Sequence, residues 1–432
     1  MIKKLKLFLI VTIANCLLVA AAQAQLVVEI SGDVQNPTPI AISPFAWSGS
    51  GVLSEDVSEI VSADLRRSGL FAPVPREDML SFPKTPEDVV FRDWRILGTE
   101  YVVTGRMEPQ AGGYLLTFDL TNIFGQSKVF TKQVRGSSQQ LRDIAHRAAD
   151  EIFEAITNIR GAFSTEMLYV QETTRNGRPS YALMRADIDG ARAREVRRFD
   201  QPVMSPMWSP DGQEVAYVSF ETGRPAIFRE NLRTGARQQL TNFKGINSSP
   251  TWSPDGTKLA MVLSKDGNPE IYVLDLNSGK FTRMTRHFAI DTEPNWMPDG
   301  KSLVFTSDRG GKPQIYELTL ATGQVDRLTF DGDYNARPRV SPDGKTLVMV
   351  HRSRGVFTIA TMDIKSGRMR VLTETSLDES PSIAPNGAML MYATKRGNKG
   401  ILAAVSLDAG GKYNLPSQRG DVREPAWSPY FD

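Results

Sequence analysis

The sequence has 432 residues, of which 41% are hydrophobic and 23% are charged, so it is long enough for two or three domains of a soluble globular protein. Its 51 Lys and Arg residues against 49 Asp and Glu residues give a formal net charge of +2. This near balance provides no global electrostatic attraction for nucleic acid or for an anionic membrane, so neither is expected as a partner.

The first 24 residues have the pattern of a secretory signal peptide. Three lysines within the first six residues precede an apolar run over 7–22, and Ala-Gln-Ala at 22–24 fits a small-residue cleavage site. A retained membrane anchor is the alternative, but the apolar run is short for a membrane span. We therefore expect residues 1–24 to be removed on export, and no direct membrane insertion of the mature chain.

Cleavage changes two properties of the mature chain. It removes three lysines and no acidic residue, which lowers the formal net charge from +2 to −1. It also removes Cys16, the only cysteine in the sequence. The exported protein is therefore expected to have no thiol, no disulfide and no metal bound through cysteine.

Residues 25–160 contain no repeat and predict a small α/β domain. Strands are expected at 26–30, 39–42, 100–107, 114–120 and 128–134, and helices at 54–69, 86–97 and 138–159. The first helix is marked at both ends, because Ser54 is a favourable N-cap and Gly69 a favourable end, with apolar residues at helical spacing between them. Gly161 marks the expected boundary with the remainder of the chain, residues 161–432.

A seven-residue phrase recurs through this second part with a nearly constant spacing. The copies are PMWSPDG at 206–212, PTWSPDG at 250–256, PNWMPDG at 294–300, PRVSPDG at 338–344, PSIAPNG at 381–387 and PAWSPYF at 425–431. Their leading prolines are 44, 44, 44, 43 and 44 residues apart. A repeat of this length is typical of a solenoid or a propeller, in which each unit buries its apolar face against its neighbours.

Each repeat predicts four short strands. Ser-Pro-Asp-Gly is a turn sequence, because proline presets φ, aspartate hydrogen-bonds its own backbone and glycine tolerates a positive φ. An apolar strand follows each turn, and two more strands follow after loops that contain glycine or asparagine. Four strands in about 44 residues are one propeller blade.

The two ends of the repeat region predict a closed ring. Residues 166–200 resemble the last three strands of a blade but lack the phrase, whereas the phrase at 425–431 has no strands after it. We expect 426–430 to supply the innermost strand of the blade that begins at Glu166, which gives six blades and leaves no exposed edge. A linear solenoid is the alternative, but it would need polar capping repeats at both ends.

The sequence contains no catalytic constellation. Gly-Lys-Ser at 300–302 and Gly-Lys-Thr at 344–346 lack the first glycine of a phosphate-binding loop, and there is no Gly-x-Ser-x-Gly elbow. The three histidines, His146, His287 and His351, are scattered and form no paired metal motif. We therefore expect neither an enzyme nor a bound metal or cofactor.

Two repeated residue types could suggest a ligand site. The repeated aspartates are explained by turn formation, and the tryptophans Trp208, Trp252, Trp296 and Trp427 by packing between blades. A single ion in a central channel remains open. The alternative functions are a propeller hydrolase or lyase, or a solute-binding propeller, either of which would use channel carboxylates.

The chain resembles the TolB family of periplasmic proteins over essentially all of its mature length. The most specific segments are FSTEMLYV at 163–170, MSPMWSPDG at 204–212, LDESPSIAPNG at 377–387 and PAWSPY at 425–430. The resemblance implies a periplasmic scaffold of the Tol–Pal envelope system of Gram-negative bacteria, which supports outer-membrane integrity and constriction during cell division. It does not imply an enzyme.

The resemblance also implies two binding regions and their partners. The loops that lead into each phrase would bind the peptidoglycan-associated lipoprotein Pal at the propeller mouth. The positions are Ile246, Asn247, Ser249, Asp291, Thr292, Glu293, Asn335, Arg337, Asp378, Glu379, Arg423 and Glu424. Other envelope proteins and bacteriocins are further partners that the resemblance allows.

The mature N-terminus would bind the inner-membrane protein TolA. The residues are Gln25, Leu26, Val27, Val28, Glu29, Ile30, Ser31, Gly32, Asp33, Val34, Gln35 and Asn36. The apolar, extended character of 26–30 suits addition to a sheet edge of a partner, and the alternative is an ordinary first strand of the α/β domain.

Overall fold

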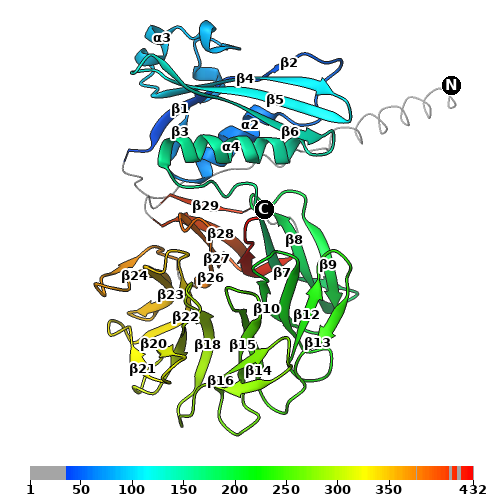
Figure 1. The fold of residues 1–432 in the computed structure, drawn as a ribbon, viewed down its shortest axis with the longest axis vertical. Helices are drawn as coiled ribbons and strands as arrows, with labels where there is room; N and C mark the ends of the chain where they lie inside the picture. The colour runs from blue at the N-terminus through cyan, green and yellow to red at the C-terminus, as the bar shows by residue number, and fades with distance from the viewer. Residues whose placement is uncertain (1–35, 376, 408–410, 416–419, 432) are drawn as a thin grey trace, which may run out of the picture.

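The computed structural model describes residues 36–375, 377–407, 411–415 and 420–431, which form an N-terminal α/β domain and a six-bladed β-propeller (Figure 1). This confirms the predicted fold class. The predicted signal peptide and the predicted strand at 26–30 lie outside the described residues. Within the described part of the chain, no helix is both long and apolar enough to cross a membrane.

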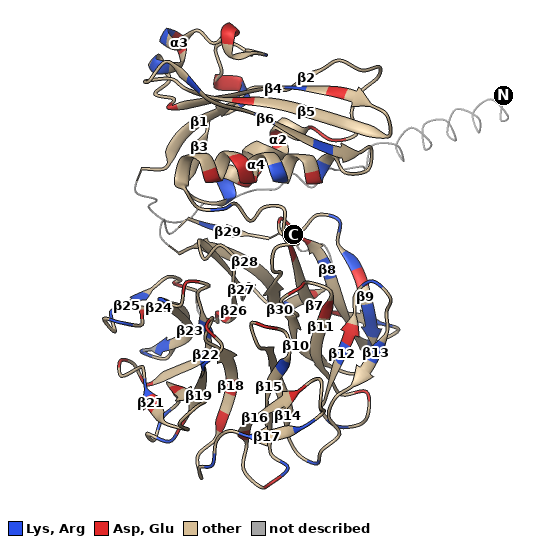
Figure 2. Cartoon of the chain, in the orientation of Figure 1, with Lys and Arg blue, Asp and Glu red and all other residues tan. Residues whose placement is uncertain are grey.

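The N-terminal domain is one sheet covered on one face by two helices. The sheet has the order β3-β1-β4-β5-β6, and β2 pairs with β4. The strands are β1 Thr38–Ile42, β2 Ala46–Trp47, β3 Phe71–Pro73, β4 Tyr101–Gln110, β5 Gly113–Asn122 and β6 Ser127–Ser137. Helices α2 (Val57–Arg67) and α4 (Leu141–Thr157) pack on the sheet, and Figure 2 marks acidic and basic residues along α4.

Two predicted helices differ from those in the structure. The N-cap of α2 is Asp56 and not Ser54, because the Asp56 carboxylate accepts hydrogen bonds from the backbone N–H groups of Ser58 and Glu59. The predicted helix at 86–97 is interrupted. A 3₁₀ turn, η2 (Pro86–Asp88), is followed by extended residues and then by α3 (Phe91–Ile96). Val89 breaks the helix because its side chain is buried in a small cluster with Trp94.

Each propeller blade is a four-stranded antiparallel sheet, numbered here from the blade that follows residue 200. Blade 1 contains β10 Val203–Trp208, β11 Glu214–Ser219, β12 Ala226–Asn231 and β13 Arg237–Gln239, and blade 2 contains β14 Asn247–Trp252, β15 Lys258–Leu263, β16 Glu270–Asp275 and β17 Phe281–Arg283. Blade 3 contains β18 Asp291–Trp296, β19 Ser302–Ser307, β20 Gln314–Thr319 and β21 Val325–Arg327, and blade 4 contains β22 Tyr334–Val340, β23 Thr346–Ser353, β24 Val356–Asp363 and β25 Met369–Val371. Blade 5 contains β26 Glu379–Ile383, β27 Met389–Arg396, β28 Lys399–Ser406 and β29 Lys412–Asn414, and blade 6 contains β30 Asp421–Trp427, β7 Glu166–Arg175, β8 Arg178–Asp187 and β9 Arg194–Phe199.

The C-terminal strand closes the ring as predicted. Blade 6 has the order β30-β7-β8-β9, so its innermost strand comes from the end of the chain. The strand runs over Asp421–Trp427 and not over 426–430, because the inner strand of every blade begins ahead of the repeated proline. Ala426 pairs with Leu168, and the Ser428 N–H donates to the Glu166 carbonyl at 2.9 Å.

The repeated phrase is used for structure. The indole N–H groups of Trp252 and Trp296 each donate to a backbone carbonyl of the preceding blade, at 3.3 Å and 3.2 Å. In the turn that follows Trp252, Asp255 accepts from the Ser253 hydroxyl at 2.5 Å and from the Thr257 N–H at 3.0 Å. These bonds hold the pKa of Asp255 at about 2. The tryptophans therefore join blades, and the aspartates hold turns.

A buried network of ion pairs joins the two domains. Arg142 of α4 lies 3.3 Å from the Asp187 carboxylate at the end of β8, and it also contacts Asp189 in the turn that follows. His146 of α4 lies 2.7 Å from the Asp64 carboxylate of α2. Burial alone would lower the pKa of His146, but the carboxylates of Asp64 and Asp187 oppose this effect and raise the pKa to about 10.

Neutral contacts extend this interface along blade 5 and the C-terminal residues. Gly69 has a φ of 71°, and a Cβ atom there would lie 3.0 Å from the backbone of Gly411. In the link between α4 and β7, the Arg160 carbonyl accepts from the Asn386 side chain at 2.9 Å. The Arg160 guanidinium stacks 3.7 Å from the ring centre of Tyr430. The N-terminal domain therefore rests on the turns at one end of the blades, and the opposite end of the propeller is left open.

The raised pKa of His146 predicts a stability that depends on pH. The folded-state pKa of about 10 lies above the ordinary unfolded value of about 6.5, so protonated His146 contributes fully below pH 6.5. That contribution is lost as the pH rises from 6.5 to 10. We expect the difference in unfolding free energy between the native chain and His146→Gln, measured with urea, to shrink over this range.

A variant at a half-buried histidine of the propeller tests whether the effect is local. His287→Gln should follow the native chain at every pH, because His287 lies outside the domain interface. A difference between the native chain and His146→Gln that stays constant from pH 6 to pH 10 would contradict this assignment.

Candidate functional site

The open end of the propeller has a narrow neck formed by one residue from each blade. Every inner strand carries a β-bulge just before its repeated proline, and the residue there has a φ between 51° and 54°. The six residues are Ser205, Ser249, Glu293, Arg337, Ser380 and Glu424. They line a cavity of about 60 Å³ in the channel. A bulge re-aims side chains, and here it turns one polar group per blade toward the axis.

Arg337 of blade 4 contacts the inner strands of three other blades, and so connects four blades across this neck. Its Nε lies 3.2 Å from the Glu293 carboxylate, and Nη1 lies 3.5 Å from Glu424 and donates to the Ser380 hydroxyl. Burial would lower the pKa of Arg337, but the two carboxylates raise it above its ordinary value. The Arg337 guanidinium therefore holds two acidic side chains together in the channel.

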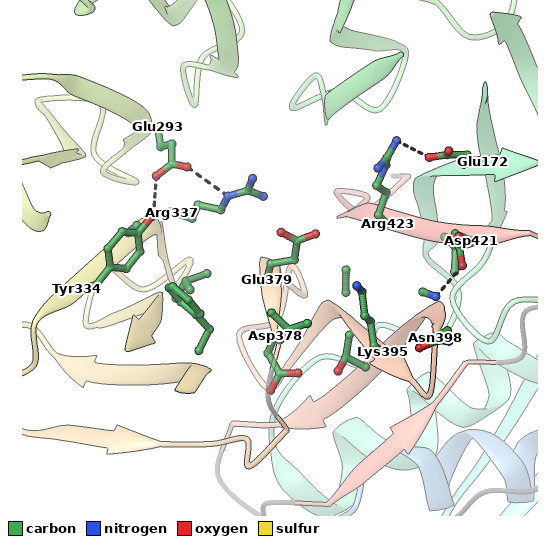
Figure 3. A pocket seen from close by; sticks show the side chains of 18 residues that line it. Glu172, Glu293, Tyr334, Arg337, Asp378, Glu379, Lys395, Asn398, Asp421 and Arg423 are labelled. Carbon is green, nitrogen blue, oxygen red and sulfur yellow. Dashed lines mark hydrogen bonds and ion pairs between the residues drawn. The ribbon is translucent and has the colours of Figure 1, made fainter. Parts of the chain in front are cut away.

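Above the neck lies a pocket of about 580 Å³ lined by residues of blades 3 to 6. Glu379 and Lys395 project into it from neighbouring strands of blade 5 (Figure 3). On the far wall, Arg423 of β30 pairs with Glu172 of β7 at 2.9 Å (Figure 3). Tyr334 adds an aromatic wall. The pocket therefore offers charges of both signs beside apolar surface.

An apolar rim lies on the loops of blades 2 to 5 at this end of the propeller. The loops that lead into the inner strands expose large apolar side chains, which are Ile246, Phe288, Ile290, Phe330 and Leu377. Phe288 is 87% exposed and stacks on His287 with the ring centres 4.2 Å apart. Phe330 is 70% exposed and lies 4.9 Å from the Arg327 guanidinium. These contacts keep both aromatic rings on the surface in defined positions.

Four of the predicted contact residues are buried beneath the rim. Asn247, Asp291, Asn335 and Asp378 occupy equivalent positions, with side chains that are fully buried. Asp291 forms a bidentate pair with Arg309, at 2.7 Å and 2.9 Å. The Asn335 amide donates to the Asp331 carbonyl at 2.7 Å. Their polar atoms hold the mouth loops in place, so any effect on a partner would pass through loop shape.

The other predicted mouth residues fall into distinct layers. Ser249, Glu293, Arg337 and Glu424 line the neck, Glu379 and Arg423 line the pocket, Ile246 is on the rim, and Thr292 is half-buried on β18. Of the predicted N-terminal binding segment, only Asn36 is described, and it is exposed with a φ of 53°. Residues 25–35 lie outside the described residues.

Sequence reasoning missed the aromatic and apolar part of the mouth. Phe288, Ile290, Phe330 and Leu377 lie ahead of the residues selected from the repeat, and Lys395 lies in the hairpin between the second and third strands of blade 5. The available signal was the His-Phe-Ala-Ile run at 287–290, which places apolar residues in a connecting loop where the blade pattern needs none.

One group of histidine and acidic side chains in the described residues lies close enough to hold a metal ion. His146, Asp187 and Asp189 present ligand atoms within 4.8 Å of one another. The same carboxylates already contact Arg67 and Arg142 in the domain interface. This group therefore serves to join the domains.

The fold and the mouth together define a two-domain β-propeller protein with a polar channel that opens into a charged pocket with an apolar rim. Two family models match the chain, the TolB amino-terminal domain over residues 26–129 and the TolB beta propeller domain over residues 153–431. The chain belongs to the TolB family.

Individual relatives agree with this assignment. The Tol-Pal system protein TolB of Pseudomonas putida is 56% identical over 437 residues and covers 100% of both chains, and that of Pseudomonas aeruginosa is 53% identical over 97% of this chain and 98% of the relative. The crystal structure of TolB from Acinetobacter baumannii has a TM-score of 0.87 and 41% identity, over 94% of this chain and all of that chain. The relatives are named as a Tol–Pal system component and not as an enzyme.

The neck predicts a specific loss of stability when its cation is removed. Arg337→Met removes the cation that contacts both Glu293 and Glu424, and it leaves the half-buried Arg339 as the remaining arginine in the same cavity. Because these three side chains are only partly exposed, we expect the variant to lose about 1–3 kcal/mol of unfolding free energy, measured with urea. Adding Glu424→Gln should restore part of that loss.

Arg233→Met is the matched control, since Arg233 is exposed and forms no ion pair among the described residues. It should change the unfolding free energy by less than about 0.5 kcal/mol. Equal losses in the two arginine variants would contradict a bridging role for Arg337.

Proposed function

We propose that the protein is a periplasmic adaptor of the Tol–Pal system whose propeller mouth binds Pal. The observation that carries this proposal is the combination of an exposed apolar rim with a pocket that contains charges of both signs. Soluble proteins rarely expose contiguous apolar surface without a partner, and protein interfaces are enriched in aromatic and arginine side chains. Membership of the TolB family supports the same role.

The aromatic rim would supply most of the binding energy. Phe288 and Phe330 are large, exposed and already held by neighbouring side chains, so little conformational entropy is lost when a partner covers them. The pocket inside the rim would then receive a projecting segment of Pal. Glu379 and Lys395 form no ion pair within 4.0 Å among the described residues, so together they can meet partner charges of either sign.

The neck and the buried loop residues would act as support for this surface. The bidentate pair of Asp291 with Arg309 fixes the approach to the inner strand of blade 3, next to the loop that carries Phe288. The Arg337 bridge holds inner strands of blades 3, 4 and 6 at the channel. A mouth with a fixed shape loses less free energy on binding than a mobile one.

The mature N-terminus, residues 25–36, would bind TolA, and this would link the two membranes. Asn36 directly precedes the N-terminal domain, which rests on the end of the propeller opposite the mouth. Because the N-terminal domain and the mouth lie at opposite ends of the propeller, this arrangement would allow both partners to be held at once. In this role the protein supports outer-membrane integrity and constriction during cell division.

The rim predicts a loss of affinity for Pal. Phe288→Ala and Phe330→Ala should each weaken Pal binding at least about tenfold, as expected for aromatic anchors, when measured by isothermal titration calorimetry. Phe124→Ala is the control, because Phe124 is 59% exposed on the N-terminal domain. Retention of native affinity in both rim variants would exclude the mouth as the Pal site.

Deletion of the N-terminal segment is predicted to abolish binding to TolA without affecting binding to Pal. A mature chain that lacks residues 25–36 should fold, keep its affinity for Pal and lose detectable binding to TolA, because the deleted residues precede the first strand, β1. Binding to each partner is measured on the same preparation. Loss of Pal binding with intact folding would contradict the assignment of two independent regions.

A further inference from the structure

One cation in the propeller channel has no counter-charge in contact with it. Arg339, on the inner strand β22, lines the same cavity of about 60 Å³ as the six neck residues. Its guanidinium donates one hydrogen bond, from Nη1 to the carbonyl of the preceding residue, Pro338, at 2.8 Å. Among the described residues it forms no ion pair within 4.0 Å and no other hydrogen bond. Most of its N–H groups are therefore left for a ligand inside the channel.

Arg339 lies one layer deeper in the channel than the neck. The neck residues directly precede the repeated prolines, whereas Arg339 directly follows one of them. The six positions that follow the prolines are Met207, Thr251, Asn295, Arg339, Ser382 and Ala426. Arg339 is the only ionisable side chain among these six. This layer of the channel therefore carries one positive charge and no acidic residue.

The two carboxylates of the cavity are held by the other arginine, Arg337. The four charges of the cavity sum to zero, but Glu293 and Glu424 both contact Arg337, at 3.2 Å and 3.5 Å, and neither lies within 4.0 Å of Arg339. The second oxygen of Glu293 accepts from the Thr306 hydroxyl and from the Arg337 N–H, each at 2.9 Å. Burial lowers the pKa of Arg339, and the two carboxylates do not offset this effect as they do at Arg337.

Hydroxyl groups add further donors to the same cavity. Ser382 of the neighbouring blade 5 lines it, and its Oγ accepts from the Trp427 N–H at 2.8 Å. This contact leaves the hydroxyl hydrogen of Ser382 without an acceptor among the described residues. The hydroxyls of Ser205 and Ser249 also line the cavity and form no hydrogen bond with the described part of the chain. A cavity of this size holds a small ion with a few waters, and its free groups are mainly donors.

We propose that Arg339 and the three serine hydroxyls bind a small monovalent anion, of the size of chloride, inside the propeller channel. Charge-assisted hydrogen bonds from the guanidinium would supply most of the affinity. A metal cation is disfavoured, because the Arg337 guanidinium already occupies the position between Glu293 and Glu424. The anion would give the second arginine of the channel its counter-charge, and this site is independent of any partner at the mouth.

The position of the ion is tested with crystals of the full mature chain soaked in sodium bromide, since bromide can replace chloride and is located by its anomalous scattering. We expect a bromide next to the Arg339 guanidinium, and none at that position in crystals of Arg339→Met. A parallel soak in calcium chloride probes for a cation, and we expect it to leave the cavity without calcium.

Chloride affinity in solution, measured from the broadening of the chloride NMR signal, provides the second arm. Arg339→Met should weaken binding at least about tenfold, as expected for the loss of a charged donor. Ser382→Ala keeps the arginine and should weaken binding about threefold, through the loss of one neutral hydrogen bond. Arg233→Met removes an exposed arginine outside the channel and should leave the affinity unchanged. No bromide in the cavity, calcium in its place, or native affinity in both channel variants would each overturn the proposal.

Discussion

The pairing of β30 with β7 is the contact on which the rest of the molecule depends. It joins residues about 260 positions apart in the sequence, as in the pair Ala426 with Leu168. The same strand supplies Glu424 to the neck and the Ala426 carbonyl that accepts the Trp208 indole N–H at 3.0 Å. Tyr430, just beyond it, stacks on Arg160 in the link between the domains. The C-terminal segment therefore closes the ring, supplies a residue to the channel and contacts the link between the domains.

Closure explains how a repeated sequence can present a single, non-repeated surface. The phrase residues build turns and join blades in each repeat, and they leave the loops at the other end of the strands free to vary. The six positions of the neck have the same backbone conformation but carry serine, glutamate or arginine. The symmetric backbone therefore carries chemically different side chains, and the pocket is lined by residues from only four of the six blades.

The sequence predicted the parts of the fold that depend on local pattern. Period, turn chemistry and the two incomplete repeats were sufficient for six blades and their closure. Val89 breaks a predicted helix because of a buried neighbour, Trp94, and no local rule shows that contact. The structure brings the residues selected from the repeat to one end of the propeller, but the sequence could not show that Asp291 is buried, since its partner Arg309 comes from another loop. Phe288 was overlooked because the exposure of its side chain depends on how all the blades of the propeller are arranged.

The most direct test of a rigid mouth that binds Pal is hydrogen–deuterium exchange of the mature chain with and without saturating Pal. We expect slower exchange in the loops at 243–247, 286–290, 330–334 and 377–379, and unchanged exchange in the turns at 209–213, 253–257 and 297–301 on the opposite end of the blades. Protection confined to those turns, or to the N-terminal domain, would contradict the account.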